Sequence, residues 1–131
     1  MRYLLDTHAL IWFISDADRL SDSAAEAIRD GPEVYASHVS LWEMVTKSRA
    51  GTLNVEGSLF TGVGAWFETN VPKAQLAELP ISAGHLAAVE FLPDHHRDPF
   101  DRLLIAQATT ERLTFITNDE LIKPYGIETL W

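Results

Sequence analysis

Five acidic residues stand where their carboxylates could do chemistry: Asp6, Glu43, Asp98, Asp101 and Asp119. Carboxylate oxygens are the ligands that Mg²⁺ and Mn²⁺ prefer. Three or four carboxylates within a few ångströms repel one another unless a divalent cation neutralises them. Such a group suits phosphoryl chemistry, in which a bound metal ion generates the nucleophile and steadies the leaving oxygen.

The stretch HRDPFDRLLIAQA, residues 96–108, holds two of these acids at the start of an apolar helix. Asp98 is a good helix N-cap, because its carboxylate can accept hydrogen bonds from backbone N–H groups of the first turn. Pro99 then takes the first helical position, where a missing N–H costs nothing. Asp101, at the third position, can reach back to the cap and favours the positive end of the helix. Helix-start chemistry therefore explains both acids as fully as a metal site does.

The other three acids have structural explanations too. Asp6 can cap the segment that follows it, and Asp119 can lie in a turn with Asn118. Glu43 stands three residues after Ser40, which is the spacing of a capping box. These separate roles would have to coincide at one edge of one sheet, so we favour a single cause, a divalent cation.

Strand and helix patterns alternate along the chain, which predicts an α/β fold with a parallel sheet of four or five strands and helices on both faces. The predicted strands are residues 2–5, 34–37, 76–79 and 114–117, with a possible fifth at 127–130. The predicted helices are residues 22–30, 39–49, 59–69, 82–91 and 99–112, and residues 9–14 form a further apolar segment. No repeat or linker interrupts this pattern, so we expect one domain over residues 1–131.

Ligands bind outside the carboxyl ends of the strands in sheets of this type. Asp6 follows the first strand directly, Glu43 lies in the first turns of the helix after the second, and Asp119 comes two residues after the fourth. Asp101 opens a helix that follows the long loop 93–97, which can bring its first turn to the same edge. We therefore expect these four acids to meet there.

The composition limits the kind of protein this can be. The 131 residues carry ten basic and nineteen acidic side chains, a net charge of −9, which argues against a passive nucleic-acid coat. Metal-dependent chemistry and a basic protein partner both remain compatible with this charge. No apolar run approaches the ~20 residues that span a bilayer, and the first residues, MRYLLDTHALIWFI, do not have the pattern of a signal peptide. With no cysteine in the sequence, we expect a cytoplasmic protein.

Several short segments resemble the PIN-domain ribonucleases, in particular the VapC-type toxins of toxin–antitoxin pairs. The segments are LLDTHAL (4–10), SLWE (40–43), RDPFDRLLIA (97–106), TND (117–119) and YGI (125–127). No single segment is specific, but their order is, and together they span nearly the whole chain.

This resemblance implies a Mg²⁺- or Mn²⁺-dependent endoribonuclease that acts as the toxin of a type II toxin–antitoxin system. It implies hydrolysis of RNA phosphodiester bonds by a metal-activated water. The metal ligands would be Asp6, Glu43 and Asp101, directly or through water, together with Asp119. The resemblance leaves the role of Asp98 open, and we expect it to be the helix N-cap first and an outer-sphere ligand second. The implied partners are RNA and a cognate antitoxin, with a homodimer or a heterotetramer or larger assembly with the antitoxin.

Other polar residues are candidates for contacts with RNA. Arg102 follows the third acid directly and is the best single candidate to steer an RNA phosphate. Thr7 and Thr117 can orient a water or a phosphate oxygen, although buried hydroxyls more often satisfy backbone groups. His95 and His96 beside Arg97 suggest a phosphate contact but are more simply explained as a solvated loop. Lys47 and Arg49 can line the same groove as Glu43.

The residues that follow Asp6 disfavour two other classes of protein that have an Asp after the first strand. A haloacid-dehalogenase-like phosphatase also starts with an Asp after a strand, but it needs a second Asp where this chain has His8. A receiver domain needs paired acids that Asp6-Thr7 does not provide. The remaining alternative is a catalytically inactive PIN-like binding module or scaffold. The presence of an acid at all four positions, Asp6, Glu43, Asp101 and Asp119, argues against it.

Overall fold

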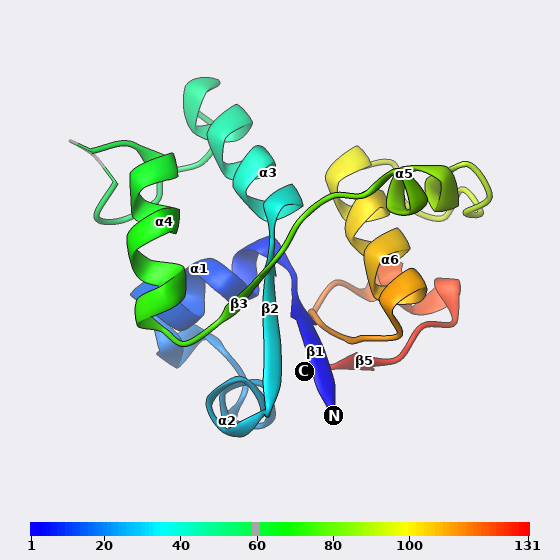
Figure 1. Cartoon of the computed structure of the whole chain (residues 1–131), viewed down its shortest axis with the longest axis horizontal. Coiled ribbons are helices and arrows are strands. Elements are labelled where there is room, and N and C mark those ends of the chain that lie inside the picture. The colour runs from blue at the N-terminus through cyan, green and yellow to red at the C-terminus, as the bar shows by residue number, and fades with distance from the viewer. Residues whose placement is uncertain (59–60) are drawn as a thin grey trace.

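A twisted parallel sheet forms the centre of the computed structural model, which describes residues 1–58 and 61–131 (Figure 1). The strand order is β3-β2-β1-β4-β5, and every pair of neighbours is parallel. The strands are β1 (Arg2–Leu5), β2 (Glu33–Ser37), β3 (Ala77–Leu79), β4 (Thr114–Ile116) and β5 (Thr129–Leu130). The α/β prediction is confirmed, and the possible fifth strand is present as a short edge strand.

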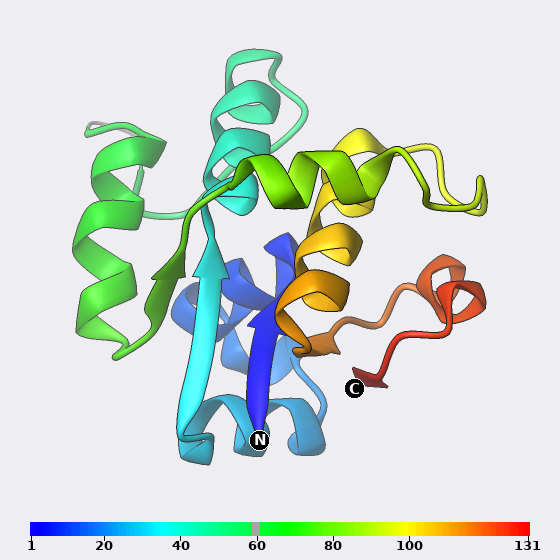
Figure 2. The same cartoon turned by 45° about the vertical axis from the view of Figure 1, so that its right-hand side comes forward.

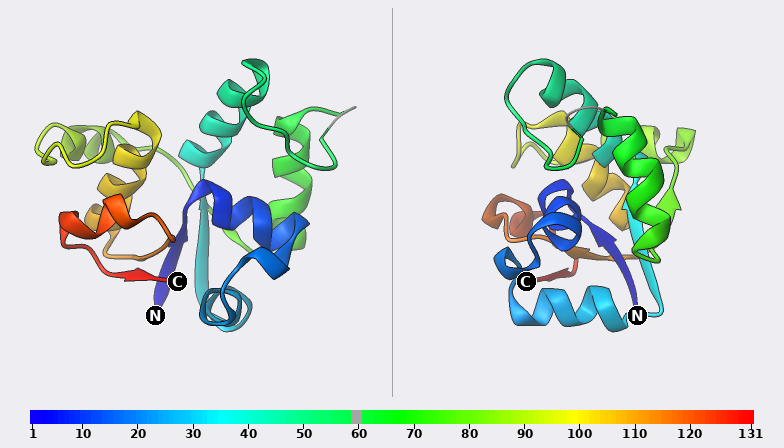
Figure 3. Two further views of the ribbon diagram at one scale, coloured as in Figure 1. Left: turned by 180° about the vertical axis from the view of Figure 1, so that it is seen from behind. Right: turned by 90° about the vertical axis from the view of Figure 1, so that its left-hand side faces the viewer.

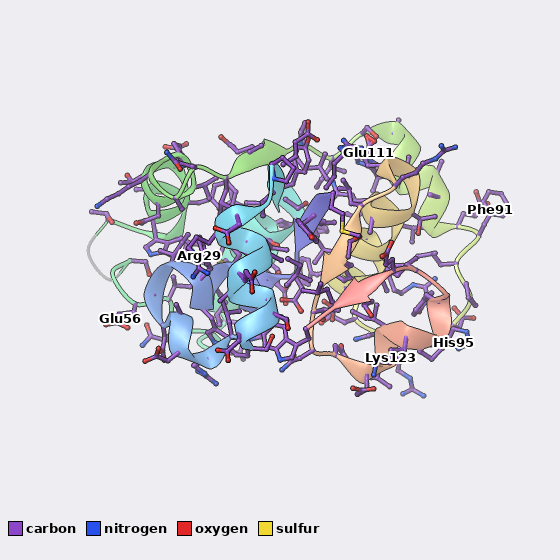
Figure 4. All side chains as sticks on the ribbon, turned by 90° about the horizontal axis from the view of Figure 1, so that it is seen from below. Arg29, Glu56, Phe91, His95, Glu111 and Lys123 are labelled. Carbon is purple, nitrogen blue, oxygen red and sulfur yellow. The ribbon has the colours of Figure 1, made fainter. Side chains whose placement is uncertain are left out.

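Helices cover both faces of the sheet, as Figures 1 and 2 show. They are α1 (Thr7–Ser15), α2 (Asp22–Asp30), α3 (His38–Arg49), α4 (Val63–Lys73), α5 (Ala83–Val89) and α6 (Pro99–Glu111), with 3₁₀ helices η1 (Ala17–Arg19) and η2 (Glu120–Tyr125). Seen from below, α2 passes across the amino ends of the strands, and Phe91 extends from the loop that follows α5 (Figure 4). Within the described ranges, no helix is long and apolar enough to cross a bilayer.

Alternation along β1 divides the apolar core in two, because successive strand residues point to opposite faces of a sheet. Tyr3 and Leu5 pack into a cluster with side chains of α1, α2, α3 and α4. Leu4 packs into a second cluster, which α6 dominates through Leu104 and its neighbours. A strand that is buried on both faces in this way reads as an uninterrupted apolar run.

The predicted helix at residues 59–69 differs most from the structure. Residues 59 and 60 lie outside the described residues, and α4 begins at Val63, after Gly62 with a φ of +87°. The helix continues past the predicted end to Lys73 and includes Pro72. Pro72 has no N–H to donate to the helix, but Val71 beside it is fully buried. Burial of Val71 thus outweighs the local signal that would end the helix.

One buried amide, the side chain of Gln107, joins the two helices that carry site residues. The hydroxyl of Ser37, the N-cap of α3, donates to Gln107 Oε1 from α6. Ser37 Oγ also accepts from the Val39 backbone N–H at 2.9 Å. Gln107 Nε2 donates to the Pro80 carbonyl at 3.3 Å. The start of α3 is therefore held against the middle of α6.

We predict that Gln107→Leu lowers the free energy of unfolding by about 1–3 kcal/mol. The leucine fills similar space but leaves the Ser37 hydroxyl and the Pro80 carbonyl without their partner. In thermal denaturation followed by circular dichroism, the melting temperature should fall by several degrees. Thr110→Leu, at an exposed position of the same helix, is the control and should change stability by less than about 0.5 kcal/mol. Equal melting of Gln107→Leu and wild type would show that this amide is dispensable.

Candidate active site

An acidic cleft of about 350 Å³ opens at the carboxyl ends of β1, β2 and β4. The chain builds the sheet outward from β1 in both directions, and crevices form at such switch points. From behind, the starts of α1 and α3 and the segment after β4 converge at this edge (Figure 3, left). The residues that line the acidic cleft are Asp6, Thr7, His8, Glu43, Lys47, Asp101, Asn118 and Asp119.

Asp6 is both a helix cap and a wall of the cleft. Its carboxylate accepts from the Ala9 backbone N–H at 2.7 Å, as the N-cap of α1. Burial raises the pKa of Asp6, against the opposing effect of hydrogen bonds with the Thr117 hydroxyl and Ala9. The capping explanation is therefore correct for Asp6. The capping hydrogen bond orients the carboxylate, which still lines the cleft.

Glu43 projects from the second turn of α3 and is almost completely buried, with 4 % of its side chain exposed. Its Oε1 accepts from Thr7 Oγ1 at 2.5 Å. The capping-box explanation is wrong, because Ser37 caps α3 and Ser40 lies inside the helix. Thr7 Oγ1 also lies 3.0 Å from Ser40 Oγ, so these two hydroxyls support the Glu43 carboxylate.

The first turn of α6 separates the roles of its two acids. Asp98 Oδ1 accepts from the backbone N–H groups of Phe100 at 2.8 Å and Asp101 at 3.2 Å, so Asp98 is the N-cap. Pro99 takes the first helical position, as predicted. The Asp101 carboxylate lines the cleft, and the pKa of Asp101 is raised to about 7 by burial and by the charges of Asp98 and Glu43.

His96 is the site residue that sequence analysis assigned instead to a solvated loop. Its Nε2 lies 2.8 Å from Asp119 Oδ2 and 3.2 Å from Asp101 Oδ2, and only 10 % of its side chain is exposed. Asp119 also caps η2 by accepting from the Leu121 backbone N–H at 2.9 Å. The signal available in the sequence was the position of His96 two residues before the Asp98 cap.

Lys47 places an ammonium group at the cleft. Its Nζ pairs with Glu43 Oε2 one turn earlier in α3 and lies 3.5 Å from Asp98 Oδ2. Burial lowers the pKa of Lys47, but the hydrogen bond and charge of Glu43 and the charge of Asp98 outweigh it, so the net pKa is raised. Lys47 therefore lines the same groove as Glu43, whereas Arg49 lines a separate hollow.

The three candidates for RNA contact have different positions. Thr7 lines the cleft but is 3 % exposed and engaged with Glu43. Thr117 is buried, and its Oγ1 accepts from the Asp119 backbone N–H at 3.1 Å. Arg102 is not among the cleft-lining residues. Its guanidinium donates to the Pro93 carbonyl at 2.8 Å and to nearby groups, so it holds the loop before α6.

The donor set suits a hard divalent cation. Four carboxylates from separate elements line the acidic cleft, and His96, Asp101 and Asp119 place possible ligand atoms within 4.8 Å of one another. Oxygen ligands with an excess of negative charge are what Mg²⁺ and Mn²⁺ require. Burial raises the pKa values of Asp6 and Asp101, so their charged forms are costly unless a cation neutralises them.

Comparisons of structure find the same fold in several solved complexes. This protein resembles a chain of the DNA-bound VapBC complex from Salmonella typhimurium, with a TM-score of 0.70, 16% identity and coverage of 99% of this chain and 97% of that one. A chain of VapBC2 from Rickettsia felis, bound to a promoter DNA fragment, gives a TM-score of 0.69 and 17% identity over 99% and 98%. A chain of FitAcB from Neisseria gonorrhoeae gives a TM-score of 0.63 and 19% identity, with coverage of 98% of this chain and 96% of that one. At these identities the likeness establishes a shared fold.

Comparison by sequence gives a family. No curated protein sequence matches the chain significantly. The family model of the PIN domain matches residues 3–126, which include all four acids of the cleft and Lys47 beside them. The chain therefore belongs to the PIN domain family.

Proposed function

We propose that this protein is a Mg²⁺- or Mn²⁺-dependent endoribonuclease and the toxin of a type II toxin–antitoxin system in the cytoplasm. The observation that carries the proposal is the convergence of Asp6, Glu43, Asp101 and Asp119 on one cleft at the carboxyl edge of the sheet. A fold alone would not support a nuclease, since one fold hosts many functions. The four carboxylates of the cleft, and not the fold, support a catalytic role.

In this proposal Asp6, Glu43, Asp101 and Asp119 hold the metal, directly or through water. When bound, the ion supplies Lewis acidity and an activated water for hydrolysis of a phosphodiester bond. The chain keeps the carboxylates in place: backbone N–H groups fix Asp6 and Asp119, and Thr7 fixes Glu43. Asp98 acts first as the cap of α6, and its Oδ2, which lies 3.5 Å from Lys47 Nζ, leaves an outer-sphere role open.

His96 positions two of the acids in the same scheme. Its Nε2 lies between Asp101 and Asp119, so it holds carboxylates from α6 and from the segment after β4 at a fixed separation. The backbone N–H of His96 donates to the Tyr125 hydroxyl at 2.8 Å, which anchors the ring from the side of η2. Positioning of this kind is what a metal site requires from residues around its ligands.

The proposal of an antitoxin partner rests on the structural neighbours and on charge. The VapBC and FitAB neighbours are toxin–antitoxin complexes. A net charge of −9 and an acidic cleft suit a basic partner segment. We propose the same kind of partner here, with a homodimer of the toxin or a larger assembly with the antitoxin. An inactive scaffold is disfavoured because it would have no reason to keep four acids in mutual repulsion.

We predict that Asp6→Asn, Glu43→Gln and Asp101→Asn each reduce RNA cleavage by about 100-fold or more, since a metal contributes several kcal/mol to the transition state. Asp119→Asn should cost only about 10-fold, as expected for a ligand that acts through water. The measurement is cleavage of labelled single-stranded RNA with Mg²⁺ or Mn²⁺, and with chelator as the blank. Glu26→Gln, at an exposed position, is the matched control. Full activity in any of the three variants would remove that residue from the site.

We predict that the metal-free protein loses stability as pH rises from about 4 to 7. The folded chain keeps the Asp101 proton up to a pKa of about 7, whereas the unfolded chain releases it near 3.8. With chelator at pH 7.5, Asp101→Asn should therefore melt at the wild-type temperature or higher. At pH 4 residue 101 is neutral in the folded wild type and in the folded variant, so any higher melting temperature of Asp101→Asn should disappear. Mg²⁺ should raise the melting temperature of wild type and change that of Asp101→Asn little.

Asp98 provides the control for this series. Asp98→Ala should melt several degrees lower than wild type both with Mg²⁺ and with chelator, because loss of an N-cap costs about 0.5–2 kcal/mol. Asp98→Asn should retain most of the stability, since asparagine also caps. If Asp101→Asn melts lower in chelator and keeps the full Mg²⁺ shift, Asp101 is only a helix-start residue.

We predict that the cognate antitoxin places a lysine or arginine near Asp6 and Asp101. A basic side chain there would neutralise the charge that the metal otherwise neutralises. The antitoxin would be identified by co-purification with the product of a neighbouring open reading frame. Crosslinking of carboxylates to amines, read by mass spectrometry, should join the antitoxin to one of these residues. Crosslinks confined to α2 or another distant element would argue against direct blocking of the site.

A further inference from the structure

Lys47 and His96 divide the acidic cleft between them. Lys47 Nζ contacts Glu43 and Asp98, and His96 Nε2 contacts Asp101 and Asp119. A histidine nitrogen can act as a neutral metal ligand, but a lysine ammonium cannot, because it has three donors and no lone pair. The two sides of the cleft are therefore chemically different, and only the Lys47 side carries a fixed positive charge.

The Lys47 ammonium is held in place from two elements. Glu43 lies one turn before it in α3, and Asp98 is fixed by its own role as the cap of α6. The Nζ atom also lies 5.7 Å from the centroid of the Phe100 ring. About a third of the Lys47 side chain is exposed, at 32 %. These contacts make Lys47 part of the cleft wall, unlike a freely moving surface lysine.

The carboxylate of Glu43 has both oxygens occupied by protein groups. Thr7 donates to Oε1 and Lys47 pairs with Oε2. By contrast, among residues 1–58 and 61–131, no lysine or arginine nitrogen lies within 4.0 Å of the Asp6 or Asp101 carboxylates. The positive charge that the chain supplies is thus concentrated on the Glu43 side of the cleft.

We propose that Lys47 takes the place of a second divalent cation, so that this site binds one Mg²⁺ or Mn²⁺ ion. The inference rests on the metal-dependent function proposed above. An ammonium on Glu43 Oε2 repels a divalent ion at that oxygen and also neutralises the Glu43 charge that would attract it. The single ion is then held directly by the carboxylates without the lysine, Asp6, Asp101 and Asp119, and Glu43 holds it through water. Lys47 is therefore a positioning residue that sets the number of metal ions.

The test is the number of Mn²⁺ ions that the metal-free full chain binds at pH 7.5, measured by isothermal titration calorimetry. We expect one ion per chain for wild type and two for Lys47→Met, which keeps the length of the side chain and removes its charge. Lys73→Met, at an exposed position of α4, is the matched control and should bind one. Mn²⁺ should also raise the melting temperature of Lys47→Met by several degrees more than that of wild type.

Lys47→Gln provides a second neutral variant, with a polar end that can still donate to Glu43, in case the methionine variant does not fold. It too should bind two ions. Two ions on wild type, or one ion on both folded Lys47 variants, would overturn the role of Lys47 and leave the metal-dependent function standing. Absence of Mn²⁺ binding by wild type would overturn the metal-dependent function and the inference together.

Discussion

Repulsion among carboxylates at the carboxyl edge of the sheet is the constraint around which the cleft is built. Burial makes it severe, because a charge that is removed from water is screened less. Burial raises the pKa values of Asp6 and Asp101, and the charges of neighbouring carboxylates add to this effect. Lys47 and His96 relieve part of the repulsion from within the chain. The rest of the structure must supply enough stability to hold the acids together.

That stability comes from packing on both faces of the sheet and from helix caps. The two apolar clusters fix the strands and helices, and Gln107 ties α3 to α6 through a hydrogen-bonded network that is buried. Asp6, Asp98 and Asp119 each cap a helix. In each cap one carboxylate oxygen accepts backbone N–H groups, which fixes the orientation of the other oxygen. A capping carboxylate at the cleft is therefore also held rigidly in place. Structural and functional explanations of these acids are therefore compatible.

The position of the cleft follows from the strand order. The chain places β2 and β3 on one side of β1 and β4 and β5 on the other, so the connections after β1 and β4 separate at their carboxyl ends. Asp6 and Asp119 lie in those connections, and α6 runs back toward the amino end of β4 from a first turn at the same edge. The fold that creates this cleft is shared with solved chains that are only 16–19% identical.

The sequence by itself determined the alternation of strands and helices, the Asp98-Pro99 helix start and the acids at strand ends, because periodicity and capping act over a few residues. Only the tertiary structure decided that His96 joins Asp101 and Asp119, that Lys47 reaches Asp98, 51 residues away, and that Arg102 holds a loop. It also decided that α4 continues through Pro72. Such contacts depend on strand register and helix packing, which bring together side chains that no local pattern relates.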